Sequence, residues 1–353
     1  MNSREKLLEQ LGIRHPIIQA PMAGVATPQL AAAVTNAGGL GSLGIGASTT
    51  AQARDMIEQA QALTTGSFNV NVFCHQPARR DAEAETAWVQ YLAPLFAEAG
   101  IEPPGSLDEI YTTFIEDDET LKMLLELKPA VVSFHFGLPS AQYIAALQKA
   151  GIYTMATATC PAEAATIETA GIDAIVAQGV EAGGHRGLFN PDATDERLST
   201  MVLVRLLAGQ TTLPIIAAGG IMDGRGMNAA LESGAAAAQF GTAFVLCPES
   251  SANTAYREAL KSGRAKETRL TKVLSGRPAR GIVNRLISFG EEKNSPPPAD
   301  YPLAYDAAKC LNAAGSKLGN HEFAAHWAGQ GAPLARELPA ADLVALIMEE
   351  GRS

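Results

Sequence analysis

Cysteine is scarce in this chain, and its spacing argues against two common kinds of site. The four cysteines, Cys74, Cys160, Cys247 and Cys310, lie far apart, and no two of them form a CxxC pair. Disulfide frameworks in small secreted domains and structural zinc sites both bring cysteines together at short, regular spacings. The pattern is typical of reduced thiols, and we expect a cytoplasmic protein.

Long apolar runs and an excess of positive charge are also missing. No segment reaches the roughly 18 apolar residues of a membrane-spanning helix, and residues 1–16 lack the apolar stretch of a signal peptide. The 27 Lys and Arg are outnumbered by 37 Asp and Glu, which gives a formal net charge of -10 without long runs of one sign. These features argue against membrane and nucleic-acid partners, although a local positive group could still bind a small anion.

What the chain does contain is a regular alternation of short apolar segments and helical patterns. Hydrophobic residues make up 47% of the 353 residues, which is enough for a sizeable core. Eight apolar segments bounded by turn residues are predicted to be strands, most of them buried on both faces. They are PIIQAP (16–21), GGLGSLG (38–44), SFNVNVF (67–73), AVVSFHFG (130–137), GIYTMATA (151–158), GIDAIVAQG (171–179), LPIIAAGG (213–220) and AAAAQFGTAF (235–244). Helical stretches between them, such as PSAQYIAALQKAG, end in glycine, as helix C-termini often do.

Eight strands in strict alternation with helices predict an α/β fold, a (β/α)8 TIM barrel, rather than an open doubly wound sheet. The alternation is interrupted after the third strand, and the chain continues well past the eighth. Both extra segments follow the carboxyl end of a strand, where barrel active sites lie. We expect a barrel built from residues 1–75, 126–250 and 323–353. An insertion at 76–125 and a C-terminal extension at 251–322 would form a cap or substrate-binding region.

Glycines at two strand ends predict a phosphate site. Gly219 and Gly220 end the seventh predicted strand, and Gly241 and Thr242 lie near the end of the eighth. Barrels commonly bind phosphate at these positions through backbone N–H groups, because glycine lets the backbone approach the oxygens. Ordinary turns between strand and helix are the alternative interpretation.

A second glycine pattern is interpreted as close packing of a strand and not as a nucleotide-binding site. Gly39, Gly41 and Gly44 match the spacing of a dinucleotide-binding fingerprint, but they follow a helix and lie on a strand instead of opening a helix. We interpret them as small residues in a closely packed strand.

The choice of phosphorylated cofactor rests on side chains at the same end of the barrel. A pyridoxal enzyme needs a Schiff-base lysine, and no predicted strand contains lysine. Flavin mononucleotide (FMN) fits better. Asn69 and Asn71 point to one face of the third strand and Gln178 ends the sixth, so their amides could bind a flavin ring. An internal hydrogen-bond network within the barrel is the structural alternative.

One histidine, His185, lies between glycines in the stretch EAGGHRG. The glycines permit a tight turn that could carry the imidazole over a planar cofactor, where it could act as general base on a carbon acid. A surface-loop histidine beside Arg186 is the alternative. His75, His135 and His185 all lie near strand ends, but no HxH or HxxxH pair is present, so we expect no metal site.

Two tyrosines and a lysine recur at intervals of four in the second cap segment. Tyr301, Tyr305 and Lys309 would form one stripe on a helix, either solvated or facing a pocket for a small anion. Tyr111 in the first cap segment is a further candidate.

Together these motifs resemble those of class I nitronate monooxygenases, the propionate 3-nitronate-oxidising flavin enzymes formerly called 2-nitropropane dioxygenases. The resemblance covers nearly the whole chain. It includes IIQAPMAGV, NVNVFCH, SFHFG, AQGVEAGGHRG, AAGGIMDGRG, QFGTAFVLCPES, YDAAK and WAGQG. EAGGHRG combined with the tyrosine–lysine stretch is specific to class I.

The resemblance implies noncovalently bound FMN and assigns a role to each candidate residue. The implied cofactor-binding residues are Met22, Asn71, Gln178, Gly183, Gly219, Gly220, Gln239, Phe240, Gly241 and Thr242. His185 is implied as the catalytic residue, with a substrate pocket formed by His135, Tyr111, Tyr301, Tyr305 and Lys309. Phe240 replaces the methionine expected between Gln239 and Gly241, and a mainly backbone contact there should tolerate the change.

The implied reaction is the oxidation of alkyl nitronates, above all propionate 3-nitronate, by O2 to an aldehyde plus nitrite or nitrate. It would proceed by one-electron transfer to FMN and a flavin semiquinone. His185 would remove the α-proton of a neutral nitroalkane or stabilise the charge of a preformed nitronate, and Lys309 would bind the far carboxylate. An FMN-dependent NAD(P)H:quinone or enoyl reductase, and a noncatalytic flavin- or phosphate-binding module, are the alternatives. We expect a monomer or a homodimer.

Overall fold

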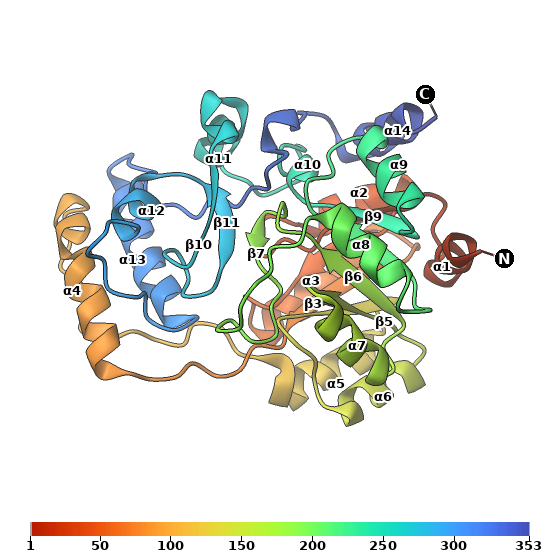
Figure 1. Ribbon diagram of the computed structural model, residues 1–353, viewed down its shortest axis with the longest axis horizontal. Coiled ribbons are helices and arrows are strands. Elements are labelled where there is room, and N and C mark those ends of the chain that lie inside the picture. Colours follow the sequence, from red (N-terminus) through yellow and green to blue (C-terminus); the bar gives the residue numbers. More distant parts are fainter. Residues whose placement is uncertain (1, 353) are drawn as a thin grey trace.

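The eight predicted strands form one closed parallel barrel (Figure 1). The computed structural model describes residues 2–352. The barrel strands are β1 (Ile17–Gln19), β2 (Gly41–Gly44), β3 (Phe68–Phe73), β4 (Val131–His135), β5 (Tyr153–Ala158), β6 (Ala174–Gln178), β8 (Ile215–Ala218) and β9 (Ala237–Phe240). They pair in the order β1-β9-β8-β6-β5-β4-β3-β2, and a parallel bridge between Ile18 and Leu40 joins the two ends. The predicted (β/α)8 barrel is confirmed.

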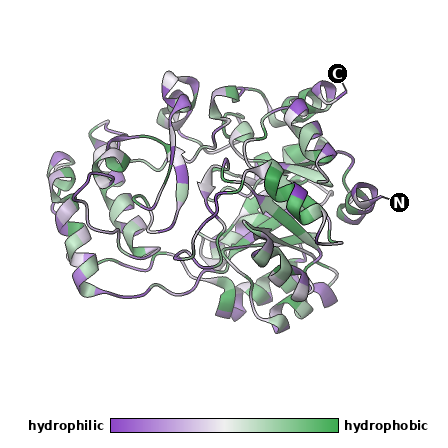
Figure 2. Ribbon diagram, viewed as in Figure 1, coloured by the Kyte–Doolittle hydropathy of each residue, from purple (hydrophilic) through white to green (hydrophobic). Residues whose placement is uncertain are grey.

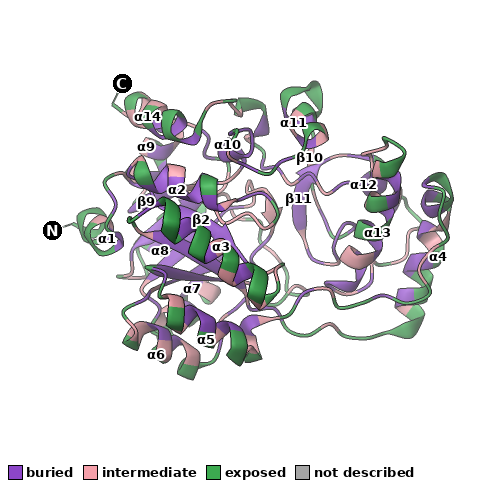
Figure 3. Cartoon of the chain, turned by 180° about the vertical axis from the view of Figure 1, so that it is seen from behind, coloured by how far each residue is buried: buried purple, intermediate pink, exposed green. Residues whose placement is uncertain are grey.

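Helices surround this barrel and turn their exposed faces outward, whereas the strands are buried (Figure 3). The ring contains α2 (Pro28–Asn36), α3 (Thr50–Leu63), α5 (Asp118–Leu127), α6 (Ala141–Lys149), α7 (Pro161–Thr169), α8 (Thr200–Ala208), α9 (Gly224–Glu232) and α14 (Ala340–Glu350). The helix directly after β9, α10 (Thr242–Val245), is too short to cover the barrel, so α14 returns from the C-terminal end and packs against α2 and α9. At the amino-terminal end of the strands, α1 (Ser3–Leu11) inserts Leu7 and Leu11 among the barrel's interior side chains.

The cap forms a second hydrophobic core beside the barrel. It contains α4 (Ala82–Glu98), α12 (Arg285–Gly290) and α13 (Leu303–Lys317), which bury Trp88, Phe96 and Leu311 between them. Figure 2 shows the more uniformly apolar barrel strands and the more mixed cap helices side by side. Helix α11 (Thr254–Lys261) lies above β10 (Thr268–Thr271) and β11 (Ala279–Ile282) in the view of Figure 1 and buries Tyr256, Ala259 and Leu260 in a further apolar cluster. No helix within residues 2–352 is both long and apolar enough to cross a lipid bilayer.

A three-stranded antiparallel sheet connects the barrel to the cap. β10 (Thr268–Thr271) pairs with β11 (Ala279–Ile282), and β11 pairs in turn with β7 (Gly184–His185). Because β7 belongs to the loop after β6, the histidine-containing loop of the barrel is hydrogen-bonded into the sheet of the cap.

Three local features differ from the sequence-based expectations. The last predicted strand (235–244) ends at Phe240, because the chain turns at Gly241 into α10. Tyr301 lies outside α13, which begins at Leu303 after Pro302, so it reaches the pocket from the preceding loop and not from the helical stripe. The expected first cap segment (76–125) extends into α5, although α5 packs against α3 and α6 in the ring.

The glycines of β2 serve close packing, as interpreted from the sequence. A Cβ on Gly41 would lie 1.9 Å from the carbonyl oxygen of Ala31 in α2, and a Cβ on Gly44 would lie 2.8 Å from the backbone nitrogen of Ala23. Helix α2 therefore rests directly on the backbone of β2 at Gly41, and the loop before α2 does so at Gly44.

Gly41→Ala is expected to destabilise the fold by about 1–3 kcal/mol, because backbone must move to admit the methyl group. The measurement is the thermal or urea unfolding midpoint. Gly105→Ala is the matched control, since a Cβ at Gly105 meets no heavy atom within 4 Å. Equal midpoints for the two variants would contradict the packing interpretation.

Candidate active site

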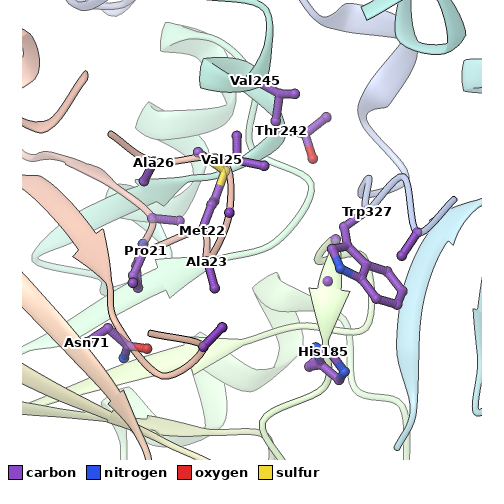
Figure 4. A pocket seen from close by; sticks show the side chains of 18 of the residues that line it. Pro21, Met22, Ala23, Val25, Ala26, Asn71, His185, Thr242, Val245 and Trp327 are labelled. Carbon is purple, nitrogen blue, oxygen red and sulfur yellow. The ribbon is translucent and has the colours of Figure 1, made fainter. Parts of the chain in front are cut away.

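A cavity of about 860 Å³ lies at the carboxyl ends of the barrel strands, beneath the cap. Figure 4 shows Met22 and Asn71 across the open space from His185 and Trp327, with Thr242 further along. Every residue that the resemblance implies for the site lines this cavity except Phe240. The Phe240 side chain is fully buried in the barrel core, while its neighbours Gln239 and Gly241 reach the cavity.

The loop that carries His185 is held by two side chains at the strand ends. The backbone carbonyl of His185 accepts hydrogen bonds from Nε2 of Gln178 at 3.0 Å and Nε2 of His135 at 3.2 Å. Oε1 of Gln178 accepts from the backbone N–H of Gly187 at 2.8 Å, and Nδ1 of His135 accepts from Thr157 Oγ1 at 3.1 Å. Both ring nitrogens of His135 are therefore occupied by protein groups, and His135 and Gln178 position the loop.

The imidazole of His185 is enclosed by aromatic rings and one hydroxyl. Its Nε2 lies 2.9 Å from Oγ of Ser275 in the cap. The centre of the imidazole ring lies 5.1 Å from the ring centre of Trp327 and 5.5 Å from that of Tyr301. It lies 5.6 Å from the ring centre of Phe136, with the two rings edge-on. Within residues 2–352 no protein group forms a hydrogen bond with its Nδ1, which is left for the cavity.

Burial keeps the histidines of the site neutral. Desolvation, together with the nearby Arg277 guanidinium and neighbouring histidines, lowers the pKa of His185 to about 3. Desolvation likewise lowers the pKa of His135 and of His75 to about 4. An ionised imidazole would lose its hydration here without gaining an anionic partner. At neutral pH, His185 is therefore uncharged.

Arg277 is a buried cation without a carboxylate partner among the described residues. It is 3% exposed, its guanidinium carbon lies 4.3 Å above the Phe136 ring, and its Nη2 donates to the carbonyl of Leu188. Burial lowers its pKa to about 10, so it stays protonated near neutral pH. This charge makes the region behind Phe136 and His185 favourable for an anion.

The tyrosines and lysine expected to form an anion pocket do come together. The ring of Tyr111 lies 6.3 Å from that of Tyr301 and 5.8 Å from that of Tyr305, and Nζ of Lys309 lies 4.8 Å from the centre of the Tyr111 ring. Burial raises the pKa values of the three phenols and lowers that of Lys309. The hydroxyl of Tyr301 is buried without a protein partner, as expected of a group that binds a ligand.

Backbone donors gather at the ends of β8 and β9. Gly219 and Gly220 have φ angles of 122° and 73°, and in the described part of the chain the N–H groups of Gly220, Ile221 and Thr242 have no acceptor. Oγ1 of Thr242 accepts from a backbone N–H at 3.0 Å, so its own proton is free. Several unpaired donors at one cavity wall suit a phosphate group.

The two strand-3 asparagines have separate environments. Asn69 donates to Ser42 at 3.2 Å inside the barrel, which is the structural alternative considered for these amides. Asn71 lines the cavity, and its Nδ2 is held 2.9 Å from Ser133 Oγ, which leaves its Oδ1 without a protein partner. Only Asn71 is placed to contact a ligand.

Arg186 excludes the surface-loop interpretation of the histidine segment. It is 2% exposed, and its Nε and Nη2 bind the two carboxylate oxygens of Asp195 at 2.9 and 3.0 Å. Its Nη1 donates to the carbonyl of Gln178. Arg186 therefore links the segment after β6 to Gln178, which precedes His185, and to Asp195, which follows it.

Sequence reasoning missed Ser275, Arg277, Phe136 and Trp327. The first two lie in the stretch LSGRPAR, a glycine-containing turn of the cap with no link in sequence to a strand end. Phe136 has a left-handed φ of 74°, which its sequence context does not reveal. Trp327 precedes AGQG in a segment noted only for its resemblance. No group of three or more potential metal-ligating side chains was found in residues 2–352.

Asp195→Asn is expected to destabilise the protein by about 1.5–3 kcal/mol at neutral pH, since it removes a charged hydrogen-bond partner of buried Arg186. Burial would raise the pKa of Asp195, but Arg186 outweighs it and holds the pKa below its usual value. The carboxylate therefore contributes stability above the ordinary value of about 3.9, and this contribution disappears as the pH falls further.

Unfolding midpoints measured between pH 7 and pH 3 check this prediction. The difference in unfolding midpoint between wild type and Asp195→Asn should become smaller as the pH falls. Asp192→Asn is the control, because Asp192 forms only exposed ion pairs with Arg79 and Lys272 and should change stability little. A gap that stays constant with pH would contradict the charged role of Asp195.

Comparisons with known proteins agree with this architecture. The family described as nitronate monooxygenase matches residues 4–350. A nitronate monooxygenase from Pseudomonas aeruginosa is 58% identical over 348 residues, covering 99% of both chains, and one from Paraburkholderia phytofirmans is 58% identical over 98% of this chain and 95% of its own.

Solved structures share the fold over nearly the full length. A nitroalkane oxidase from Streptomyces ansochromogenes superposes with a TM-score of 0.90 at 40% identity, covering 98% of this chain and 97% of its own. FabK from Thermotoga maritima gives a TM-score of 0.74 at 30% identity, over 98% and 96%. The resemblance stated from the motifs is confirmed: the chain belongs to the nitronate monooxygenase family of oxidoreductases.

Proposed function

We propose that this enzyme binds FMN and uses O2 to oxidise alkyl nitronates, preferring propionate 3-nitronate, to an aldehyde plus nitrite or nitrate. The observation that carries the proposal is the coexistence of two subsites in one cavity. A row of unpaired backbone donors lies at one wall, and a cationic phenol pocket lies near His185. A phosphorylated cofactor and a small anion can then bind side by side.

The cavity residues fit FMN by their chemistry. The N–H groups of Gly220, Ile221 and Thr242 and the free proton of Thr242 Oγ1 would hold the phosphate. Asn71 presents a free amide oxygen for a flavin N–H, and Met22 offers an apolar surface for the ring. FMN, when bound, supplies the redox centre that accepts electrons from the nitronate and delivers them to O2.

The substrate carboxylate is assigned to the pocket of Tyr111, Tyr301, Tyr305 and Lys309. The Lys309 ammonium is half-buried and has no ion-pair partner among the described residues, and the Tyr301 hydroxyl is an unpaired buried donor. Removing such groups from water is costly unless a ligand satisfies them, and a carboxylate can accept from both. A neutral substrate would leave the charge unpaired.

His185 faces the other end of the same substrate. Its Nδ1 has no protein partner among the described residues and is open to the cavity, so in the Nε2–H tautomer it can accept the α-proton of a neutral nitroalkane. The pKa of about 3 makes this imidazole a weak base in the unliganded protein, because efficient bases have pKa values near the working pH. The geometry therefore favours a substrate that arrives as the anion, stabilised by the positive charges of Arg277 and Lys309.

The experiment that tests the proposal is anaerobic mixing of the purified FMN-loaded protein with propionate 3-nitronate and, separately, with NADPH, followed by absorbance. Rapid flavin reduction by the nitronate and none by NADPH is the expected result. Reduction by NADPH alone would replace the proposal with a reductase activity. No response to either compound would indicate a noncatalytic flavin-binding protein.

Lys309→Met is expected to raise KM for propionate 3-nitronate by about 10- to 100-fold, the value of a charged hydrogen bond. Steady-state oxygen consumption measures the change. The same variant should turn over a nitronate without a carboxylate, such as propyl nitronate, with a nearly unchanged KM. Lys317→Met on the exposed end of the same helix is the control. An equal rise in KM for both substrates would contradict a role of Lys309 in binding the carboxylate.

A further inference from the structure

The cap contributes a polar turn, Ser275–Arg277, that touches His185 from outside the cavity. Ser275 is fully buried, and neither Ser275 nor Arg277 lines the cavity itself. The turn connects β10 to β11, the strand that pairs with His185. A buried hydroxyl at 2.9 Å from the imidazole Nε2 has no role in the substrate and cofactor subsites described above.

The turn is rigid. Gly276 has a φ of 89°, and a Cβ there would lie 2.5 Å from the carbonyl oxygen of Ala299. Its N–H donates to the carbonyl of Lys272 at 2.8 Å. The carbonyl of Pro278 accepts from the N–H of Arg186 at 2.8 Å, which attaches the turn to the residue next to His185. Ser275 therefore holds its hydroxyl in one place relative to the imidazole.

The other partners of Ser275 indicate which group donates and which accepts in its hydrogen bond with His185. Oγ of Ser275 also lies 3.2 Å from the carbonyl oxygen of Arg277, for which the described residues provide no other donor. A carbonyl can only accept, and leaving it unpaired when buried costs about 1–3 kcal/mol. The single hydroxyl proton therefore goes to this carbonyl. The two lone pairs of Oγ are left to accept, one from the backbone N–H of Arg277 at 3.4 Å and the other from Nε2–H of His185.

The surroundings of the other ring nitrogen, Nδ1, are consistent with donation from Nε2–H to Ser275. Nδ1 has no protein partner and faces the cavity, where a substrate or solvent can donate to it. The backbone carbonyl of His185 is already fixed by Gln178 and His135, so the ring keeps its place while the Ser275 contact selects its tautomer.

We propose that Ser275 is a positioning residue that holds neutral His185 as the Nε2–H tautomer and so presents Nδ1 to the substrate as a proton acceptor. The proposal deepens the function proposed above and rests on it for the role of His185 in turnover. The tautomer itself is a property of the protein without substrate. Substrates that must lose a proton depend on the free Nδ1, whereas preformed nitronates depend on it less.

The test compares Ser275→Ala, Ser275→Thr and, as a matched control, Ser288→Ala. Ser288 lies in the cap on α12, and its hydroxyl bonds only to the carbonyl of Asn284 within its own helix. Protein labelled with ¹⁵N-histidine is examined by NMR. A His185→Asn sample identifies the signals of this ring among the six histidines.

In wild type, Ser275→Thr and Ser288→Ala, we expect the nitrogen shifts of an Nε2–H tautomer. In Ser275→Ala, we expect a mixture with the Nδ1–H form. We also expect kcat/KM for a neutral nitroalkane to fall by roughly tenfold or more in Ser275→Ala, with a smaller change for the nitronate, because loss of tautomer control impairs a catalytic histidine. Ser275→Thr should restore both readouts.

An Nδ1–H tautomer in wild type, or an unchanged spectrum and unchanged substrate ratio in Ser275→Ala, would overturn the proposal. If Ser275→Thr does not fold, the wild-type tautomer and the Ser275→Ala spectrum still decide the outcome. A failure of the proposed function is seen separately, as a flavin that no nitronate reduces while the NMR result stands.

Discussion

The pairing of β7 with β11 is the contact on which the site depends. Two residues of a barrel loop, Gly184 and His185, become a strand in the sheet of the cap. Gln178 and His135 fix the same loop from the barrel side, and Ser275 reaches its imidazole from the cap side. Neither the barrel nor the cap holds the histidine alone, so the site exists only where the two cores meet.

Ionisable side chains that are buried without a partner of opposite charge give this site its electrostatic character. Desolvation keeps His75, His135 and His185 neutral. Arg277 stays protonated near neutral pH, desolvation lowers the pKa of Lys309, and neither has a carboxylate ion-pair partner in the part of the chain that is described. Buried Arg186, by contrast, is paired with the carboxylate of Asp195. The anionic substrate proposed above would supply the missing negative charge, so an acidic protein, with a net charge of -10, can still favour an anion locally.

The overall architecture could be predicted because its signal is local and repeated. Eight apolar segments that alternate with helical stretches suit one closed barrel. The glycines of β2 could be identified as packing residues from their position on a strand. Residues at strand ends, including Asn71, Gln178 and His185, could be placed together, since parallel strands bring their carboxyl ends to one edge. Ser275 and Arg277 could not, because no strand end marks them.

The sequence by itself determined the barrel, the positions that face its mouth and the family to which the chain belongs, since each follows from periodicity and short motifs. Only the tertiary structure decided how the pieces act on one another. It assigned His135 and Gln178 to holding the loop, separated Asn69 from Asn71, brought Tyr301 in from outside its helix and placed Ser275 against His185. Hydrogen-bond direction and desolvation depend on neighbours that are distant in the chain, and those neighbours are defined only once the two cores have packed.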